Sequence, residues 1–101
     1  MNRSYAVLWS ANGDIGPGRL DPLEDRFELQ GRNRRLSLAF ADLVSASIAR
    51  GSAERLHGLP VLALGLRDGL PPVRIASLEG SGVLHELADR VEHTGLSVLG
   101  A

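Results

Sequence analysis

The fold is decided by residues 26–40, which read RFELQGRNRRLSLAF. Apolar and polar residues alternate one for one at each end of this stretch, a two-residue period that is typical of a half-buried strand. We therefore expect two antiparallel strands at residues 26–30 and 35–40, joined by a tight turn at residues 31–33. The side chains expected to face the interior are Phe27, Leu29, Leu36, Leu38 and Phe40.

Two more strands are expected before this hairpin. Residues 5–9 are β-favouring and lead into residues 10–18, where three Gly, one Pro and an Asn-Gly pair predict a loop. Residues 19–23 predict a weaker strand, because Pro22 has no backbone N–H and is therefore expected at a sheet edge or a bulge. A tight turn over residues 23–26 then leads into the hairpin.

Residues 43–49 alternate again and predict a fifth strand, although a helix over residues 43–50 is an open alternative. Asp42 could cap such a helix, whereas the β-branched Val44 and Ile48 and the intervening serines favour a strand. The side chains expected to face the interior are Val44, Ala46 and Ile48.

The remaining strands are expected between residues 59 and 78. Residues 51–58 form a polar connection that could carry one helical turn at 52–56. Residues 59–66 are almost continuously apolar, which is typical of a strand covered on both faces. Residues 73–78 return antiparallel after a turn-rich connection at 67–72, whose Asp-Gly pair is a hairpin signal.

Residues 82–93 predict an amphipathic helix, because apolar residues recur at spacings of three and four. Ser81 is the expected N-cap, and Thr94 and Gly95 mark the expected end. The side chains expected to cover the open end of the sheet are Leu84, Leu87, Ala88 and Val91.

Seven short strands followed by one helix resemble the pleckstrin-homology superfold, including its bacterial PH-like and GRAM-like branches. Residues 18–20, 26–31, 35–48 and 82–88 carry this resemblance, which spans roughly residues 3–94. It implies one mainly β domain over residues 1–101, a bent antiparallel barrel or roll with all seven strands within residues 3–78 and a helix that caps it. An α+β fold with a helix at 43–50 is the alternative. The superfold hosts lipid binding, peptide binding and scaffolding, so it leaves the function open.

The composition is that of an ordinary folded domain. Of the 101 residues, 44% are hydrophobic and 23% are charged, which excludes a chain too polar to build a core. The net charge of -1 provides no positive field that would attract nucleic acid. The absence of Cys excludes disulfides and thiolate metal sites. No apolar run reaches the length of a signal-peptide core or a membrane helix, so we expect a soluble protein of the bacterial cytoplasm.

Arg32, Arg34 and Arg35 are the candidate binding residues. Three guanidinium groups within four residues could bind a phosphate or a carboxylate in the bidentate way that arginine favours. The resemblance implies that their turn lies at the open end of the barrel, near residues 12–18 and 68–72. Lipid-binding members of the superfold usually carry several basic residues in the first hairpin, where this chain has only Arg19, so a membrane surface is not the favoured partner.

No catalytic residue, cofactor or metal site is expected. The stretch from His85 to Asp89 is similar to a zinc-protease helix motif, but it has Asp where the second His is needed. No Gly-x-Ser-x-Gly nucleophile elbow occurs, and His57 lies in a polar connection without an evident partner.

Two features point instead to protein partners. Tyr5 and Trp9 share a strand face, where they form part of the core or anchor an interface. The small face of Ser45, Ser47 and Ala49 could pair with a partner strand or support a homodimer. We therefore predict a non-catalytic interaction module, with an anion or lipid-headgroup binder through the Arg cluster as the alternative.

Overall fold

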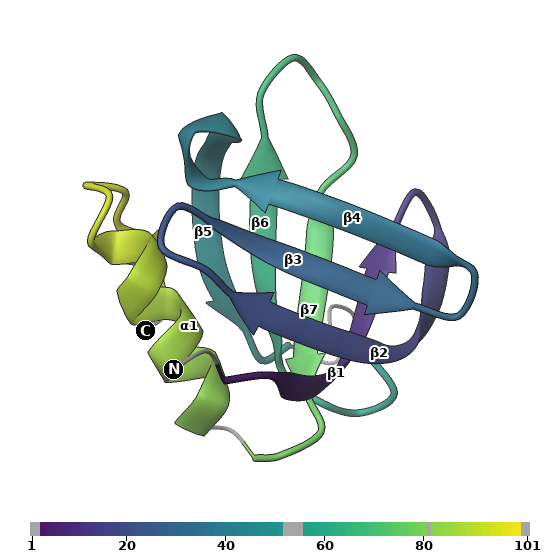
Figure 1. Ribbon diagram of the computed structural model, residues 1–101. Helices are drawn as coiled ribbons and strands as arrows, with labels where there is room; N and C mark the ends of the chain where they lie inside the picture. Colours follow the sequence, from purple (N-terminus) through teal and green to yellow (C-terminus); the bar gives the residue numbers. More distant parts are fainter. Residues whose placement is uncertain (1–2, 52–55, 81, 100–101) are drawn as a thin grey trace.

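The computed structural model describes residues 3–51, 56–80 and 82–99, which form a curled sheet with one α-helix packed on it (Figure 1). The mainly β class with a C-terminal helix is therefore confirmed. The strands are β1 (Tyr5–Ala11), β2 (Asp14–Pro22), β3 (Arg26–Gly31), β4 (Arg34–Ala39), β5 (Leu43–Ala49), β6 (Val61–Leu66), β7 (Val73–Ser77) and β8 (Val98–Leu99). The helices are the 3₁₀-helix η1 (Phe40–Asp42) and the α-helix α1 (Gly82–Glu92).

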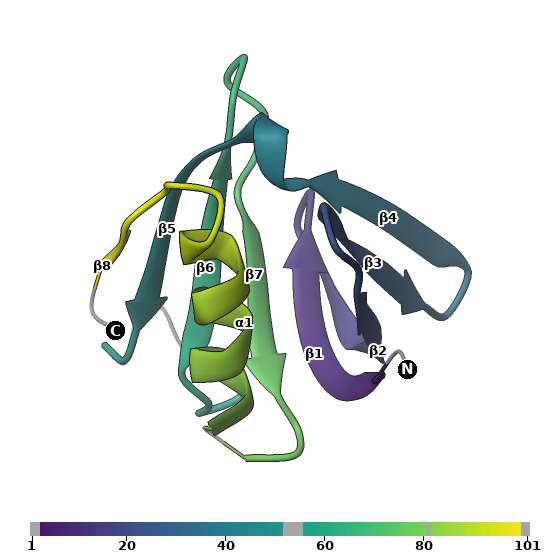
Figure 2. The ribbon, with the colours of Figure 1, turned by 60° about the vertical axis from the view of Figure 1, so that its left-hand side comes forward.

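The strands form a single sheet in the order β4-β3-β2-β1-β7-β6-β5-β8. Neighbouring strands are antiparallel except for β8, a short strand that the sequence did not predict and that pairs parallel to β5. Figure 2 shows the sheet bent into two halves that meet between β1 and β7, with α1 over the half that contains β5, β6 and β7. The molecule is thus a half-barrel with two sheet ends, β4 and β8.

The loop predicted for residues 10–18 is wrong. β1 and β2 continue through it as a regular hairpin, joined only by Asn12 and Gly13 with φ angles of 54° and 85°. Positive φ at both central residues is the geometry of the tight turns that match the twist of a hairpin. The Asn-Gly pair is therefore the turn itself, and the glycines after it belong to β2.

The edge position predicted from Pro22 is also wrong, because β2 lies between β1 and β3. Pro17 lies opposite Leu8 of β1, and Pro22 lies opposite Phe27 of β3. Each proline lies in a part of β2 that has only one neighbouring strand. Both take non-hydrogen-bonded positions in the alternating ladder, so neither costs the sheet a hydrogen bond.

The chain between β4 and β5 departs from simple alternation. Phe40 belongs to η1 rather than to the strand, yet its side chain is buried as expected. β5 confirms the strand at 43–49 and excludes the helix, but a register shift between Leu43 and Ser45 turns Val44 outward, where it is 56% exposed. The inward position predicted for Val44 is therefore wrong, whereas Ala46 and Ile48 are buried as predicted.

The apolar strand β6 lies at the centre of its half of the sheet and is covered on both faces only at its start. Leu62 and Leu64 belong to the main core, and Val61 packs on the opposite face in a small cluster with Leu8 and Leu56. The helical turn predicted at 52–56 falls mostly on 52–55, outside the described residues.

The helix α1 buries the four predicted side chains Leu84, Leu87, Ala88 and Val91 against the sheet. Beyond its last turn, Gly95 has a φ of 96° and donates its N–H to the carbonyl of Glu92, so the predicted end is confirmed. The predicted N-cap, Ser81, lies outside the described residues. Over the described part of the chain, no helix has the length and apolar content needed to cross a membrane.

Candidate binding sites

The three predicted arginines lie at the turn between β3 and β4, but their side chains do not act together. Arg32 lies in the turn and Arg35 on the outer face of β4, and both are exposed. Arg34 is half-buried and lies on the same face of the strand as Leu36 and Leu38. The turn therefore offers two exposed guanidinium groups rather than three.

Arg34 is held by the protein itself. Its guanidinium lies over the ring of Trp9, with the central carbon 3.6 Å from a ring centroid. It donates hydrogen bonds to the carbonyl oxygens of Asp14 at 2.9 Å, Trp9 at 2.6 Å and Gly16 at 3.1 Å. These contacts tie β4 to the β1–β2 hairpin, although β4 pairs with neither β1 nor β2.

Glycines in β2 and β3 make room for this stack. The indole N–H of Trp9 donates to the carbonyl of Gln30 at 3.0 Å. A Cβ at Gly18 would lie 1.8 Å from that same carbonyl oxygen, and one at Gly31 would lie 2.9 Å from Nε of Arg34. The alternation through Leu36 and Leu38 extends back to Arg34, so the sequence did contain a signal for its inward position.

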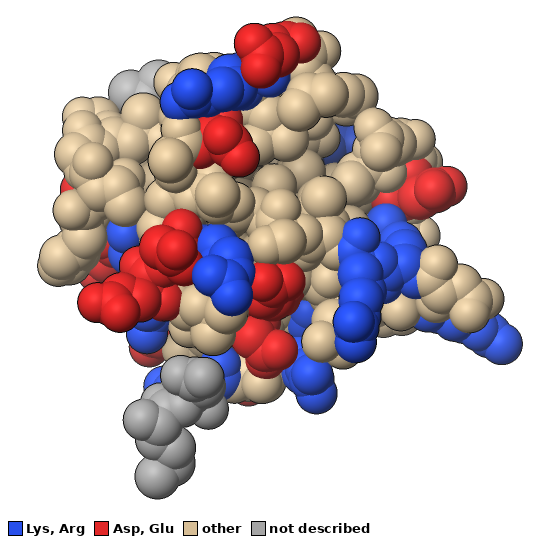
Figure 3. Space-filling view, turned by 45° about the horizontal axis from the view of Figure 1, so that its top comes forward, with Lys and Arg blue, Asp and Glu red and all other residues tan. Residues whose placement is uncertain are grey.

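A shallow groove of about 370 Å³ separates the β1–β2 and β3–β4 turns. It is lined by residues 14–17 and 32–34, so Asp14 shares it with Arg32 and Arg34 but not with Arg35. Figure 3 shows basic side chains mainly toward the right of the view and acidic side chains mainly at its centre and left, so this side of the molecule does not carry charge of one sign. Anion binding by Arg32, Arg34 and Arg35 stays a prediction.

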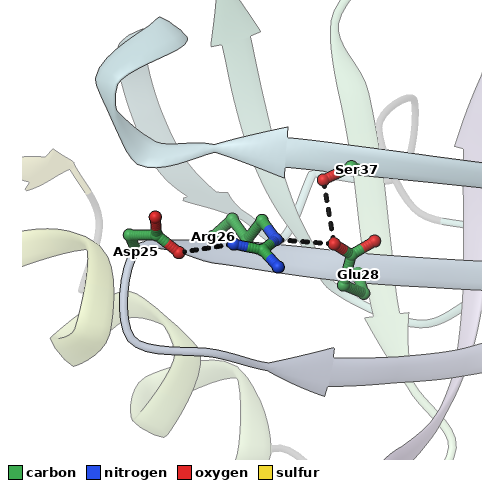
Figure 4. Close-up of polar contacts among 4 residues, drawn as sticks. All are labelled: Asp25, Arg26, Glu28 and Ser37. Atoms are coloured by element: carbon green, nitrogen blue, oxygen red, sulfur yellow. Dashed lines mark hydrogen bonds and ion pairs between the residues drawn. The ribbon is translucent and has the colours of Figure 1, made fainter.

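A polar network lies on the outer face of β3 and β4 (Figure 4). Arg26 donates to Glu28 at 2.6 Å and to Asp25 at 3.0 Å, and Ser37 donates to Glu28 at 3.0 Å. The hydrogen bonds from Arg26 and from Ser37 hold the pKa of the Glu28 carboxyl below its usual value. The bond to Glu28 raises the pKa of Arg26 in turn. The network fixes the side chains beside the free edge of β4.

The outer edge of β4 has no neighbouring strand in the described sheet, because β4 stands first in the strand order. The N–H of Leu23 donates to the carbonyl of Arg26, so the backbone groups of Arg26 point toward β2. Because these directions alternate along an antiparallel strand, Glu28 and Gln30 also bond to β2, and the residues between them bond to β4. In the register of β3 with β4, the backbone groups of Arg35 and Ser37 therefore point away from β3.

A cleft of about 240 Å³ lies beside this edge; leucines form most of its apolar lining, and Asp42, Arg67 and Asp68 line it as well. Leu36 and Leu38 of β4 form one wall, and Leu66 and Leu70 from the end of β6 and the loop after it form the other. Leu70 is 56% exposed, although leucine is among the more apolar side chains. The cleft and the unpaired backbone together form a surface that we call the β4 edge.

The strand edge predicted at Ser45, Ser47 and Ala49 is occupied in part, because β8 pairs with β5 at Ala46 and Ser47. The sequence did not indicate the β4 edge, since the position of a strand in a sheet depends on long-range pairing. Its only trace was an alternating strand with neither Lys nor Pro, the residues that commonly protect sheet edges.

The aromatic side chains of β1 belong to the core. Tyr5 is 3% exposed and Trp9 is 1% exposed, which confirms core packing and leaves neither ring accessible to a partner. The Tyr5 hydroxyl donates to Glu86 of α1 at 2.5 Å, and this bond raises the pKa of Tyr5.

The polar face of α1, which carries the stretch from His85 to Asp89 that is similar to a zinc-protease helix, makes ordinary surface contacts. A ring nitrogen of His85 lies 3.4 Å from Arg50, and one of His93 lies 2.6 Å from the backbone oxygen of Asp89. Within the described ranges, no group of three His, Cys, Asp or Glu is placed to hold a metal ion.

These observations define a small half-barrel whose accessible features are edges and grooves. A comparison of the chain with protein-family models and with curated proteins finds no match. The curled antiparallel sheet and its C-terminal helix are compatible with a PH-like barrel.

Proposed function

We propose that this chain is a non-catalytic interaction module of the PH-like kind, and that it binds an extended protein strand along the β4 edge. The observation that carries the proposal is the unpaired backbone of Arg35 and Ser37 beside a leucine-lined cleft. A strand added there gains main-chain hydrogen bonds, and the cleft receives alternate side chains. A setting in the bacterial cytoplasm belongs to the same proposal.

The proposed occupant is β4 of a second copy of the chain. Antiparallel pairing centred on Ser37 places Leu36 opposite Leu38 of the second copy, so the leucines of both strands meet on one face. Arg35 then lies opposite Ala39 of the second copy, which avoids placing two guanidinium groups directly opposite each other. The strand is thus complementary to itself, as a two-fold interface requires.

The dimer is expected to be weak and concentration-dependent. Each backbone hydrogen bond contributes only about 0.5 to 1.5 kcal/mol net, because both groups were bonded to water before pairing. The loss of translational and rotational freedom on association offsets much of that gain. We expect association in the micromolar to millimolar range rather than a permanent dimer.

Sedimentation equilibrium tests the proposal with the variants Ser37→Pro and Ser37→Ala. Proline removes the outward N–H and blocks a neighbouring strand, while the β3 ladder is retained because Ser37 takes a non-hydrogen-bonded position opposite Glu28. Alanine removes the same hydroxyl but keeps the N–H. We expect the wild type and Ser37→Ala to approach twice 10.8 kDa with rising concentration, and Ser37→Pro to stay at 10.8 kDa.

Leu70→Glu provides an independent variant, since it replaces an apolar side chain of the cleft with a further carboxylate without touching the backbone of β4. It should weaken the dimer as Ser37→Pro does, with an unchanged circular dichroism spectrum. A wild type that remains monomeric at millimolar concentration contradicts the proposal. So does a folded Ser37→Pro or Leu70→Glu variant that dimerises as strongly as the wild type.

Anion or lipid-headgroup binding through Arg32, Arg34 and Arg35 is the second candidate function, because Arg32 and Arg34 line the groove between the two hairpin turns and Arg35 is exposed beside it. Vesicles containing phosphatidylserine test it by co-sedimentation. Binding that falls steeply with salt and is lost in the Arg32→Gln, Arg35→Gln double variant supports this function. Binding that is absent, or unchanged in the double variant, rejects it.

A further inference from the structure

A row of four side chains crosses the outer face of the sheet, the face opposite α1. In the strand registers, Ser10 of β1 pairs with Arg74 of β7, Arg74 pairs with Ala63 of β6, and Ala63 pairs with Ser47 of β5. Residues paired across neighbouring strands point to the same face. Arg74 is therefore flanked on both sides by small residues.

These small residues leave a groove of about 440 Å³ around the Arg74 side chain. Pro71 and Pro72 line it near the start of β7, and the turn at Asn12 and Gly13 lines it at the end of β1. Its other lining residues are Ser10, Ser47, Ala49, Val61 and Ala63. The volume lies within the range of small-molecule sites, which are mostly apolar with a few polar groups that orient the ligand.

Among the described residues that line the groove, Arg74 is the one with a charged side chain. It is half-buried, and no carboxylate among the described residues forms an ion pair with it. The other half-buried arginines of the described chain, Arg26 and Arg34, each have carboxylate or carbonyl partners. A partly desolvated guanidinium without an internal acceptor favours an external anion.

We propose that this groove binds a compact organic carboxylate, with Arg74 as the residue that receives the carboxyl group. The planar fork of arginine matches the two oxygens of a carboxylate. Ser10 and Ser47 stand at the two ends of the row, and their hydroxyls supply further hydrogen-bond partners. Ala49, Ala63 and the prolines, which are all at least partly exposed, offer apolar contact to the body of the ligand.

The groove favours a carboxylate over a phosphate monoester, because the described residues supply it with one cation only. A phosphate ester carries up to two negative charges at neutral pH and is usually met by several donors. A monocarboxylate is matched in charge by Arg74 alone. The apolar walls also favour a ligand whose remaining atoms are carbon.

NMR titration of the full chain with benzoate tests the proposal, and benzamide serves as the uncharged control ligand of the same shape. We expect benzoate to shift the backbone amides of Ser10, Ser47, Ala63 and Arg74 in a saturable way. Arg74→Gln should weaken benzoate binding about tenfold or more, as expected for the loss of a charged hydrogen-bond donor. Arg32→Gln, a matched loss of an exposed arginine, should leave the affinity unchanged.

Three results would overturn the proposal. The first is equal binding of benzoate and benzamide, and the second is benzoate shifts that survive Arg74→Gln or that centre on Arg32 and Arg35. The third is tighter binding of phenyl phosphate than of benzoate at the same residues. The groove and the β4 edge are separate, so Ser37→Pro should bind benzoate as the wild type does, whatever its association state.

Discussion

Replacing Arg34 by Gln should destabilise the fold far more than the same change at Arg32 or Arg35. The Arg34 guanidinium stacks on Trp9 at 3.6 Å and donates to three backbone carbonyls at 2.6 to 3.1 Å. A cation over a partly desolvated aromatic ring contributes about 0.5 to 2 kcal/mol. A hydrogen bond from a charged donor contributes about 1.5 to 3 kcal/mol.

These contributions are not additive, and glutamine can retain one hydrogen bond, so we expect a net loss of about 2 to 3 kcal/mol. For a domain of this size, that loss lowers Tm by about 10 °C or more. Thermal and urea unfolding followed by circular dichroism measure it. Arg32→Gln and Arg35→Gln change exposed side chains and should stay within about 0.5 kcal/mol of the wild type.

The conservative variant Arg34→Lys separates charge from geometry. Lysine keeps the positive charge but lacks the planar fork, so it should recover only part of the lost stability. If Arg34→Gln unfolds at the same temperature as Arg32→Gln, then Arg34 does not hold β4 to the first hairpin, and its assignment as a structural residue is wrong.

Three further predictions follow from the packing and the polar network. Leu87→Ala should cost about 2 to 5 kcal/mol in urea unfolding, because the side chain is fully buried between α1 and the sheet. Gly18→Ala should prevent stable folding, measured by the loss of amide dispersion in NMR spectra, because its Cβ would lie 1.8 Å from the Gln30 carbonyl oxygen. Hydrogen bonding, above all from Arg26, lowers the pKa of Glu28 from its ordinary 4.5, so this stabilisation is fully present above pH 4.5 and is lost as the pH falls through the lowered value. The urea midpoints of wild type and Glu28→Gln should therefore differ at pH 7 and converge in acid.

Each of these predictions has a contrary result. An alanine at Gly82, where a Cβ meets nothing within 4 Å, is the control for Gly18→Ala and should fold normally. Equal behaviour of the two alanine variants would contradict the close approach at Gly18. A Leu87→Ala variant as stable as His85→Ala would contradict the role of α1 as the cover of the core. A difference at Glu28 that persists unchanged at pH 2 would contradict its ionic origin.

Local periodicity predicted the strands around residues 26–40, from alternation, and the buried face of α1, from spacings of three and four, because each depends on a period within one segment. It failed at Val44, where a register shift in β5 breaks the period. It also failed over residues 14–18, because glycine and proline normally punctuate loops. Gly18 lies within a strand, and the position needs glycine because Trp9 and the Gln30 carbonyl occupy the space that a side chain would fill.

The sites were less predictable than the strands. The cluster at residues 32–35 was visible in the sequence, but the stacking of Arg34 on Trp9 joins residues 25 positions apart. The row through Arg74 needs the registers of four strands, none of which a single segment specifies. The β4 edge likewise depends on the order of strands in the whole sheet.

Amide hydrogen exchange along β4 tests the proposed interaction surface most directly. Leu36 and Leu38 take the hydrogen-bonded positions opposite β3, so their amides should be protected at every protein concentration. The amides of Arg35 and Ser37 should exchange rapidly in dilute protein and become protected as the concentration rises. Protection of Arg35 and Ser37 that is already present in dilute protein, or that never appears in concentrated protein, would contradict an open β4 edge that pairs with a second copy.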